Sequence, residues 1–140
     1  MDEQLDMKRF LLGFLLFLFG QISFAGDEGS RAMQFEEPLY KNTEAPFDID
    51  LDIEPSANEF ELQDYSVMSS ESGNRQAMLT IYNTASGQRI VNEDHIVAIL
   101  GNGHRVHPHA FKLKLSGEQT VNQTVQFGNR RYPIVKIIMH

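Results

Sequence analysis

The 140-residue chain contains no cysteine and no tryptophan, and only five of its residues are proline. Without cysteine there is no disulfide, no thiolate metal ligand, no thiol nucleophile and no lipid-modified cysteine behind an export signal. Without tryptophan, the phenylalanine, tyrosine and branched aliphatic residues have to form the core. A folded domain of this chain therefore depends on apolar burial, or on a partner or metal, for its stability.

The first 25 residues have the layout of an export signal. Met7-Lys8-Arg9 supplies a positive start, and residues 10–19 form an apolar run interrupted only by Gly13. Ser23 and Ala25 then place small residues at the −3 and −1 positions before Gly26. This order is typical of a cleaved secretory signal peptide, so we expect the mature protein to be periplasmic or secreted.

An uncleaved membrane anchor is the alternative for this segment, but an anchor needs about 20 apolar residues to cross the hydrocarbon core. The run here ends at Gly20-Gln21, which favours cleavage and predicts no stable membrane anchor afterwards. The acidic residues before Met7 are unusual at the start of a signal, so translation from Met7 instead of Met1 is a second possibility.

The remainder, residues 26–140, suits one domain. Residues 26–46 are rich in Gly, Glu, Asp and Ser and show no sustained hydrophobic period, which predicts a flexible acidic arm. From Phe47 to Ile53 apolar residues alternate with acids, the pattern of a half-buried strand. Pro55 then ends that strand or marks it as a sheet edge.

Further strand patterns follow at short intervals, separated by turns rich in glycine. Residues 59–67 form one, with a kink expected near Asp64 because Tyr65 falls out of the alternation. Residues 88–100 are ambiguous, since Asn92-Glu93-Asp94 is a possible helix cap, but the β-branched run after it favours a strand. The other expected strands cover residues 77–83, 104–115, 120–127 and 132–139.

About seven strands without a confident helix predict an all-β fold, an immunoglobulin-like antiparallel β-sandwich over residues 47–140. The likeness is architectural only, because the cysteines and tryptophan of true immunoglobulin domains are missing.

Charge is divided between the two halves of the predicted mature chain. Residues 26–64 hold twelve acidic against two basic residues, whereas residues 65–140 hold four acidic against eight basic. The split indicates that the halves face each other, or that one half meets a charged partner; a solvated acidic leader explains it equally well. The net negative charge argues against nucleic-acid binding.

The most unusual local cluster is His104, His107 and His109, three of the five histidines within six residues. In an extended segment, His107 and His109 point to the same side about 7 Å apart, so the cluster is a candidate site for Zn²⁺ or Cu²⁺, with Met139 and His140 as further ligands. Pro108 between them favours instead an ordinary surface hairpin, or side chains against the core. A pH-sensing cluster is a third interpretation.

The acids at positions 48, 50, 52 and 54 share the alternate spacing of a calcium loop. The residues between them are apolar, however, and the glycine and final glutamate of such a loop are absent. The spacing is that of a strand with one solvent-exposed face. Lys112 and Lys114 form a complementary ladder that could pair with it.

Catalytic motifs are absent from the sequence: it has no G-x-S-x-G elbow, no glycine-rich phosphate loop and no H-E-x-x-H. We therefore expect a non-enzymatic protein without a bound cofactor. The leading hypothesis is an exported protein-binding or envelope-assembly module that pairs through an edge strand near Phe47–Ile53. The alternative is a small metal-binding protein that uses the histidine cluster. The sequence sets no oligomeric state.

Overall fold

The computed structural model describes residues 31–46 and 59–140 of the chain. The longest sheet contains β1 (Gln34–Glu36), β2 (Phe60–Ser69), β3 (Asn74–Asn83) and β8 (Thr120–Asn129), side by side in that order. All of its neighbouring strands are antiparallel.

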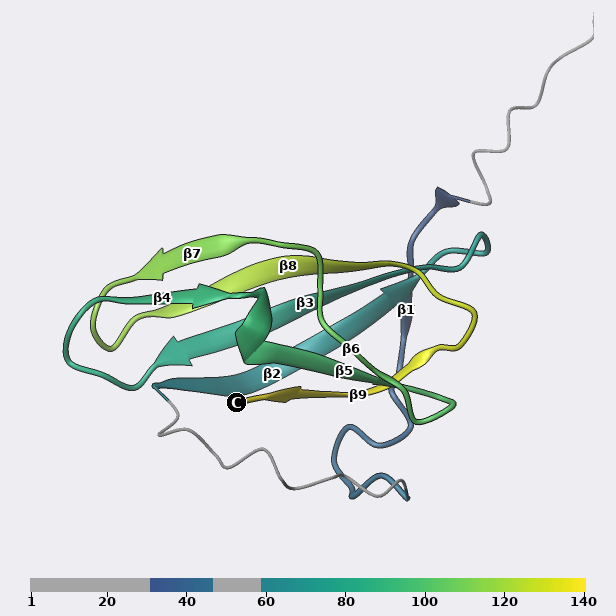
Figure 1. Cartoon of the computed structure of the whole chain (residues 1–140), viewed down its shortest axis with the longest axis horizontal. Helices are drawn as coiled ribbons and strands as arrows, with labels where there is room; N and C mark the ends of the chain where they lie inside the picture. The colour runs from purple at the N-terminus through teal and green to yellow at the C-terminus, as the bar shows by residue number, and fades with distance from the viewer. Residues whose placement is uncertain (1–30, 47–58) are drawn as a thin grey trace, which may run out of the picture.

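Two shorter antiparallel sheets lie against this one (Figure 1). One pairs β4 (Arg89–Asn92) with β7 (Lys112–Leu115). The other has β5 (Ile96–Leu100) between β6 (Arg105–Val106) and β9 (Ile134–Met139). Side chains from all three sheets meet in one core, whose fully buried members include Val67, Leu79, Ile81, Val91, Ile96, Leu115 and Phe127. The described residues thus form an all-β, sandwich-like fold of antiparallel sheets. The predicted all-β class is confirmed.

The kink expected near Asp64 is present as a register shift. Leu62 pairs with Ile81 and Asp64 with Thr80, so one residue of β2 is left over between them. Such a bulge turns the following side chains to the other face of the sheet. It explains why both Phe60 and Tyr65 reach the core although they differ in parity.

The ambiguous residues 88–100 hold two strands, β4 and β5, joined by the 3₁₀ turn η2 (Glu93–His95). The polar residues favour the turn locally: the backbone N–H of Asn92 donates to His95 Nδ1 at 3.2 Å, and Asn92 Nδ2 to Asp94 Oδ2 at 3.2 Å. Every residue of β5 is buried. A strand covered on both faces shows no period of two, which is why its pattern resembled that of a helix.

Residues 31–46, the described part of the acidic arm, carry β1 and run on to the sheet of β9. Tyr40 donates its backbone N–H to the Val135 carbonyl at 3.0 Å, and Lys136 Nζ donates to the Thr43 carbonyl at 2.8 Å. The arm was expected to lack regular structure, and its described part is instead bonded to both layers. The signal over residues 1–25 and the strand from Phe47 to Ile53 lie outside the described residues and stay predictions.

Candidate functional site

Among residues 31–46 and 59–140, the outer edge of β2 has a strand partner over only part of its length. β1 pairs with Val67, Met68 and Ser69, the last three residues of β2 before the turn to β3. On that same side no strand of the described ranges pairs with residues 60–66. Alternate N–H and C=O groups of this stretch face away from β3, because antiparallel pairing engages only every second residue on each side. An open edge of this kind is a template for an added strand.

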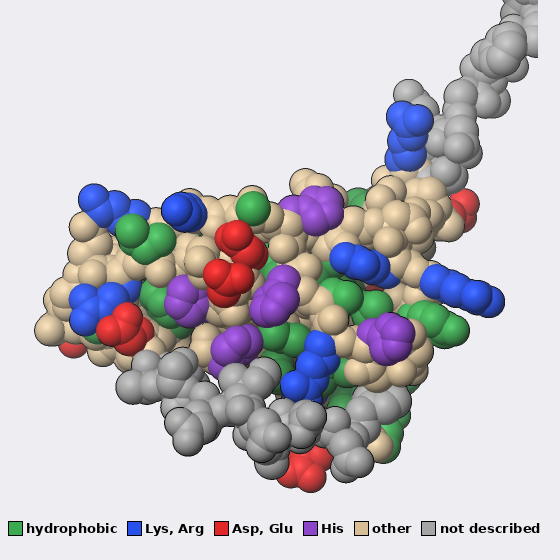
Figure 2. All heavy atoms as spheres, in the orientation of Figure 1, with side chains coloured by type: hydrophobic (Ala, Val, Ile, Leu, Met, Phe, Trp, Pro, Cys, Tyr) green, Lys and Arg blue, Asp and Glu red, His purple; other side chains and the backbone are tan. Residues whose placement is uncertain are grey.

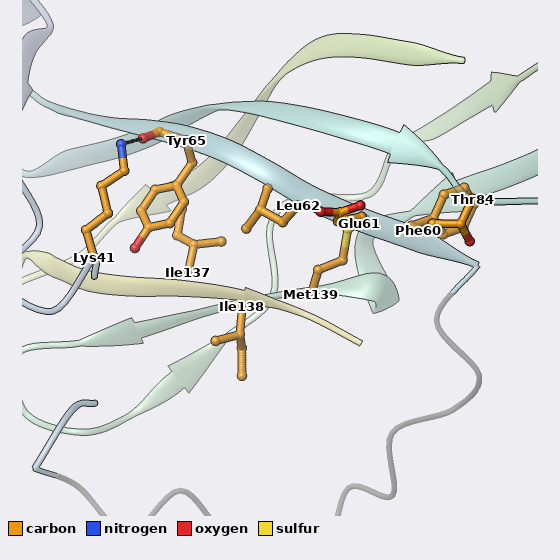
Figure 3. Close-up of a pocket in the computed structure, with 9 residues that line it drawn as sticks. All are labelled: Lys41, Phe60, Glu61, Leu62, Tyr65, Thr84, Ile137, Ile138 and Met139. Carbon is orange, nitrogen blue, oxygen red and sulfur yellow. Dashed lines mark hydrogen bonds between the residues drawn. The ribbon is translucent and has the colours of Figure 1, made fainter. Parts of the chain in front are cut away.

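A hollow of about 510 Å³ lies beside this open edge, between β2 and β9 (Figure 3). Phe60, Leu62 and Tyr65 line it from β2, while Ile137, Ile138 and Met139 line it from β9. The two strands belong to different sheets, so the hollow is the gap between layers at one side of the sandwich. Its lining is mixed, because Lys41, Glu61 and Thr84 stand beside these apolar side chains, so the hollow offers both apolar contacts and polar partners to side chains that enter from the edge.

Lys41 closes one end of the hollow. Its Nζ donates to the Tyr65 carbonyl at 2.5 Å, lies 2.7 Å from Asp64 Oδ1 and sits 5.1 Å from the centre of the Tyr65 ring. The hydrogen bond from Lys41 is the main reason why the pKa of the Asp64 carboxyl is lowered. Burial raises the pKa of the Tyr65 phenol, and the neighbouring backbone of Ile137 opposes that rise. Lys41 therefore links residues 31–46 to β2 at Asp64 and Tyr65, close to the end of the stretch that β1 leaves unpaired.

The Lys41–Asp64 contact predicts a pH-dependent coupling. Because the folded pKa of Asp64 is lowered, the stabilisation is fully present above the unfolded value of 3.8 and is lost as the pH falls through the folded pKa. We expect a double-mutant cycle of Lys41→Met and Asp64→Asn to give a coupling of about 0.5–1 kcal/mol at pH 7, since the Asp64 carboxylate is largely exposed to solvent. Urea unfolding at pH 7 and pH 2.5 measures it, with Lys114→Met as an exposed control. A coupling as large at pH 2.5 as at pH 7 contradicts the assignment.

A second hollow of about 360 Å³ continues the first on the far side of Lys41 and Tyr65. It is lined by residues of the arm, Phe35 and Glu36 among them, and by Ser66. Phe35 and Leu39 are 71% and 76% exposed, unusually high for large apolar side chains. The two hollows share Lys41 and Tyr65, and Phe35 contributes an exposed aromatic side chain to the second one.

Acidic side chains flank the open stretch of β2. Glu59 is paired with Arg89, whose Nε lies 2.8 Å from Glu59 Oε1, and Asp64 is paired with Lys41. Glu61 is exposed on the strand between them and is among the residues that line the larger hollow. Within the described ranges no salt bridge involves Glu61. Among the described residues, this edge therefore combines a partly apolar hollow with one carboxylate that has no salt-bridge partner.

The three candidate metal ligands lie in different surroundings. His107 Nδ1 is 2.9 Å from the Ile96 carbonyl, and its ring centre is 6.4 Å from that of His140. His109 donates its backbone N–H to the Gln126 carbonyl at 2.6 Å, and its ring lies against Gly128. His104 is exposed, with its backbone N–H on Asn102 Oδ1 at 3.2 Å.

Histidine side chains are spread along the face shown in Figure 2. In the part of the chain that the structure describes, no three His, Cys, Asp or Glu side chains gather as a metal site would require. His140, named as a further ligand, does approach His107, and His95 packs edge-on against Phe60 at 5.2 Å between ring centres. The binding of Zn²⁺ or Cu²⁺ by His104, His107 and His109 stays a prediction from the sequence.

The acidic ladder at positions 48–54 lies outside the described residues, so its pairing with Lys112 and Lys114 stays a hypothesis. In the structure these lysines stand opposite Asn92 and Ile90 of β4, and both are exposed. None of the described helical segments has the length and hydropathy to span a bilayer.

Sequence reasoning did not find the hollow or the open part of β2, because both arise where strands distant in sequence come together. The kink near Asp64 was the one local signal of an irregular edge. No protein-family model matches the chain, and neither a curated protein nor a solved structure matches it significantly.

Proposed function

We propose that this protein is a non-enzymatic binding module that takes up an extended segment of another protein along the open edge of β2. The observation that supports the proposal most is the coincidence of two features: residues 60–66 lack a strand partner on one side within the described ranges, and a partly apolar hollow lies directly beside them. The first supplies main-chain hydrogen bonds, and the second supplies space for alternate side chains. Together these are the requirements of β-strand addition.

The location and the biological setting follow from the sequence. An export signal over residues 1–25 would deliver the protein to the periplasm or the exterior, where an edge-binding module can serve envelope assembly. The sequence predicted a binding edge over Phe47–Ile53, which lies outside the described residues. We place the binding edge on β2 instead, because the strand pairing of its residues within the described ranges is known. The absence of recognisable catalytic motifs from the sequence is consistent with a binding role.

A designed peptide tests the proposal without knowledge of the natural partner. The probe has nine residues in which threonine and valine alternate, with a central lysine in a threonine position and therefore between two valines. The control has the same sequence with every second amide N-methylated. We expect the probe to bind and to slow amide exchange in residues 60–66, because added strand bonds protect outward N–H groups. N-methylation on the bonding edge should abolish binding, since those amides no longer donate.

Two control peptides are made, one with the odd-numbered and one with the even-numbered amides N-methylated. In one of the two, the methyl groups lie on the peptide edge that faces β2. Binding measured by fluorescence anisotropy that is equal for the probe and both methylated forms would exclude strand addition. Protection confined to residues outside β2 would place the site elsewhere, and a complete lack of binding would also contradict the proposal.

A further inference from the structure

The charge along the open edge specifies the partner more closely than the fold does. We infer that the segment bound at β2 is an extended one with a cationic side chain between two apolar side chains, the cation standing opposite Glu61. This inference rests on the proposed function and adds the chemical class of the partner.

The apolar positions follow from the two faces of β2. Phe60 and Leu62 flank Glu61 in the strand and line the hollow together with Met139 of β9. Successive residues of a strand point to opposite faces, so an added strand sends every second side chain toward the hollow. Apolar side chains that enter there release water by contact with Phe60, Leu62 and Met139, the apolar part of a mixed lining.

The cationic position follows from Glu61. Its cross-strand neighbour on β3 is Tyr82, which in turn pairs with Thr120 of β8, and neither residue carries a positive charge. A strand added on the other side places a residue opposite Glu61, with Cβ atoms about 4.5–5.5 Å apart. Lysine or arginine there pairs with the carboxylate, whereas aspartate or glutamate is repelled. Glu59 and Asp64 do not compete for the same cation, since Arg89 and Lys41 already hold them.

Segments of this same protein fit the edge less well. Two-fold pairing of β2 with its copy brings the acidic side chains of both copies into one short stretch. The alternating segment at positions 47–54 carries four acids of its own. β7 has the right alternation of lysine and leucine, but Leu115 is 1% exposed and Leu113 packs on the core, so its apolar side chains are already used. A different protein with a basic-apolar segment is the occupant that the charges favour.

The test compares two peptides on three forms of the full chain. The nine-residue valine–threonine peptide is made with a central lysine and with a central glutamate, and each is titrated into the wild type, Glu61→Gln and Glu61→Lys. We expect the wild type to prefer the lysine peptide by about fivefold, as a cross-strand ion pair at an exposed edge allows. Glu61→Gln should remove the preference and Glu61→Lys should reverse it. Added salt at 0.5 M should reduce it in the wild type.

The outcomes separate the two proposals. If neither peptide binds, the proposed function itself fails. If both bind with equal affinity in all three forms, strand addition stands and the requirement for a cation is wrong. Glu61 is exposed, so all three forms should share one circular dichroism spectrum.

Discussion

Replacing Phe127 by alanine is expected to lower the free energy of unfolding by about 3–5 kcal/mol. Phe127 is fully buried near the end of β8, in the core to which all three sheets contribute. Loss of its ring removes apolar contacts from this core and leaves a cavity that rigid strands cannot fully close. A domain of this size has a total stability of only about 5–15 kcal/mol, so this variant should be close to unfolding at 37 °C.

Urea unfolding of the mature chain, followed by tyrosine fluorescence and circular dichroism, measures the effect. Gln126→Ala is the matched control, because Gln126 precedes Phe127 in β8 and its side chain is exposed. The control should change the stability by less than about 0.5 kcal/mol. A loss below 1 kcal/mol for Phe127→Ala would mean that β8 does not pack against the other layers as described.

Alanine at Gly117 should be the second large perturbation, with a loss of about 3 kcal/mol or more. A Cβ atom placed on Gly117 would lie 1.9 Å from the Ser86 carbonyl oxygen and 2.3 Å from its carbon. Both atoms belong to the backbone, so no change of rotamer relieves the contact. The turn after β3 and the turn after β7 would have to separate.

Separation of these turns breaks a buried polar network. Asn83 is fully buried, and its Nδ2 donates to the Gly87 carbonyl at 2.9 Å and to the Ser116 carbonyl at 2.8 Å. Its Oδ1 accepts from the Ala85 N–H at 3.1 Å. Each buried polar group left without a partner costs about 1–3 kcal/mol, so disruption of two or three of them gives the expected loss.

Gly87→Ala is the matched control for Gly117→Ala. Gly87 belongs to the same pair of turns, but a Cβ there comes no closer than 3.4 Å, to Nη1 of the Arg89 side chain. This substitution should be neutral or stabilise by a few tenths of a kcal/mol. Equal melting temperatures for the two alanine variants would show that the turns do not approach each other as closely as described.

The strands that the sequence predicted well are those with one buried face. In β2 the alternation was visible on each side of the bulge, and in β8 Val125 and Phe127 alternate with exposed Thr124 and Gln126. β5 was harder, because burial on both faces removes the period.

β1 could not be predicted, because all three of its residues are exposed. Its position depends on partners distant in sequence, such as the Ser69 hydroxyl that donates to Glu36 Oε2 at 2.7 Å. The open part of β2 and the hollow beside it were not predicted for the same reason: the hollow lies between two strands about 75 positions apart, and no local pattern encodes their spacing.

The contact between the arm and β9 also constrains the order in which the molecule can be completed. Lys136 and Thr43 are 93 positions apart, and loops of that length close late because the entropy cost is high. Ribosomes synthesise the amino-terminal end first, so the arm emerges long before β9, the strand with which it forms hydrogen bonds. Until β9 has been synthesised, the side of the sandwich next to β2 lacks that strand, and the arm has no contact partner there. A partly synthesised chain therefore exposes this edge of β2 to other proteins, chaperones included. It is the same edge that we propose as the binding site for the mature protein's partner.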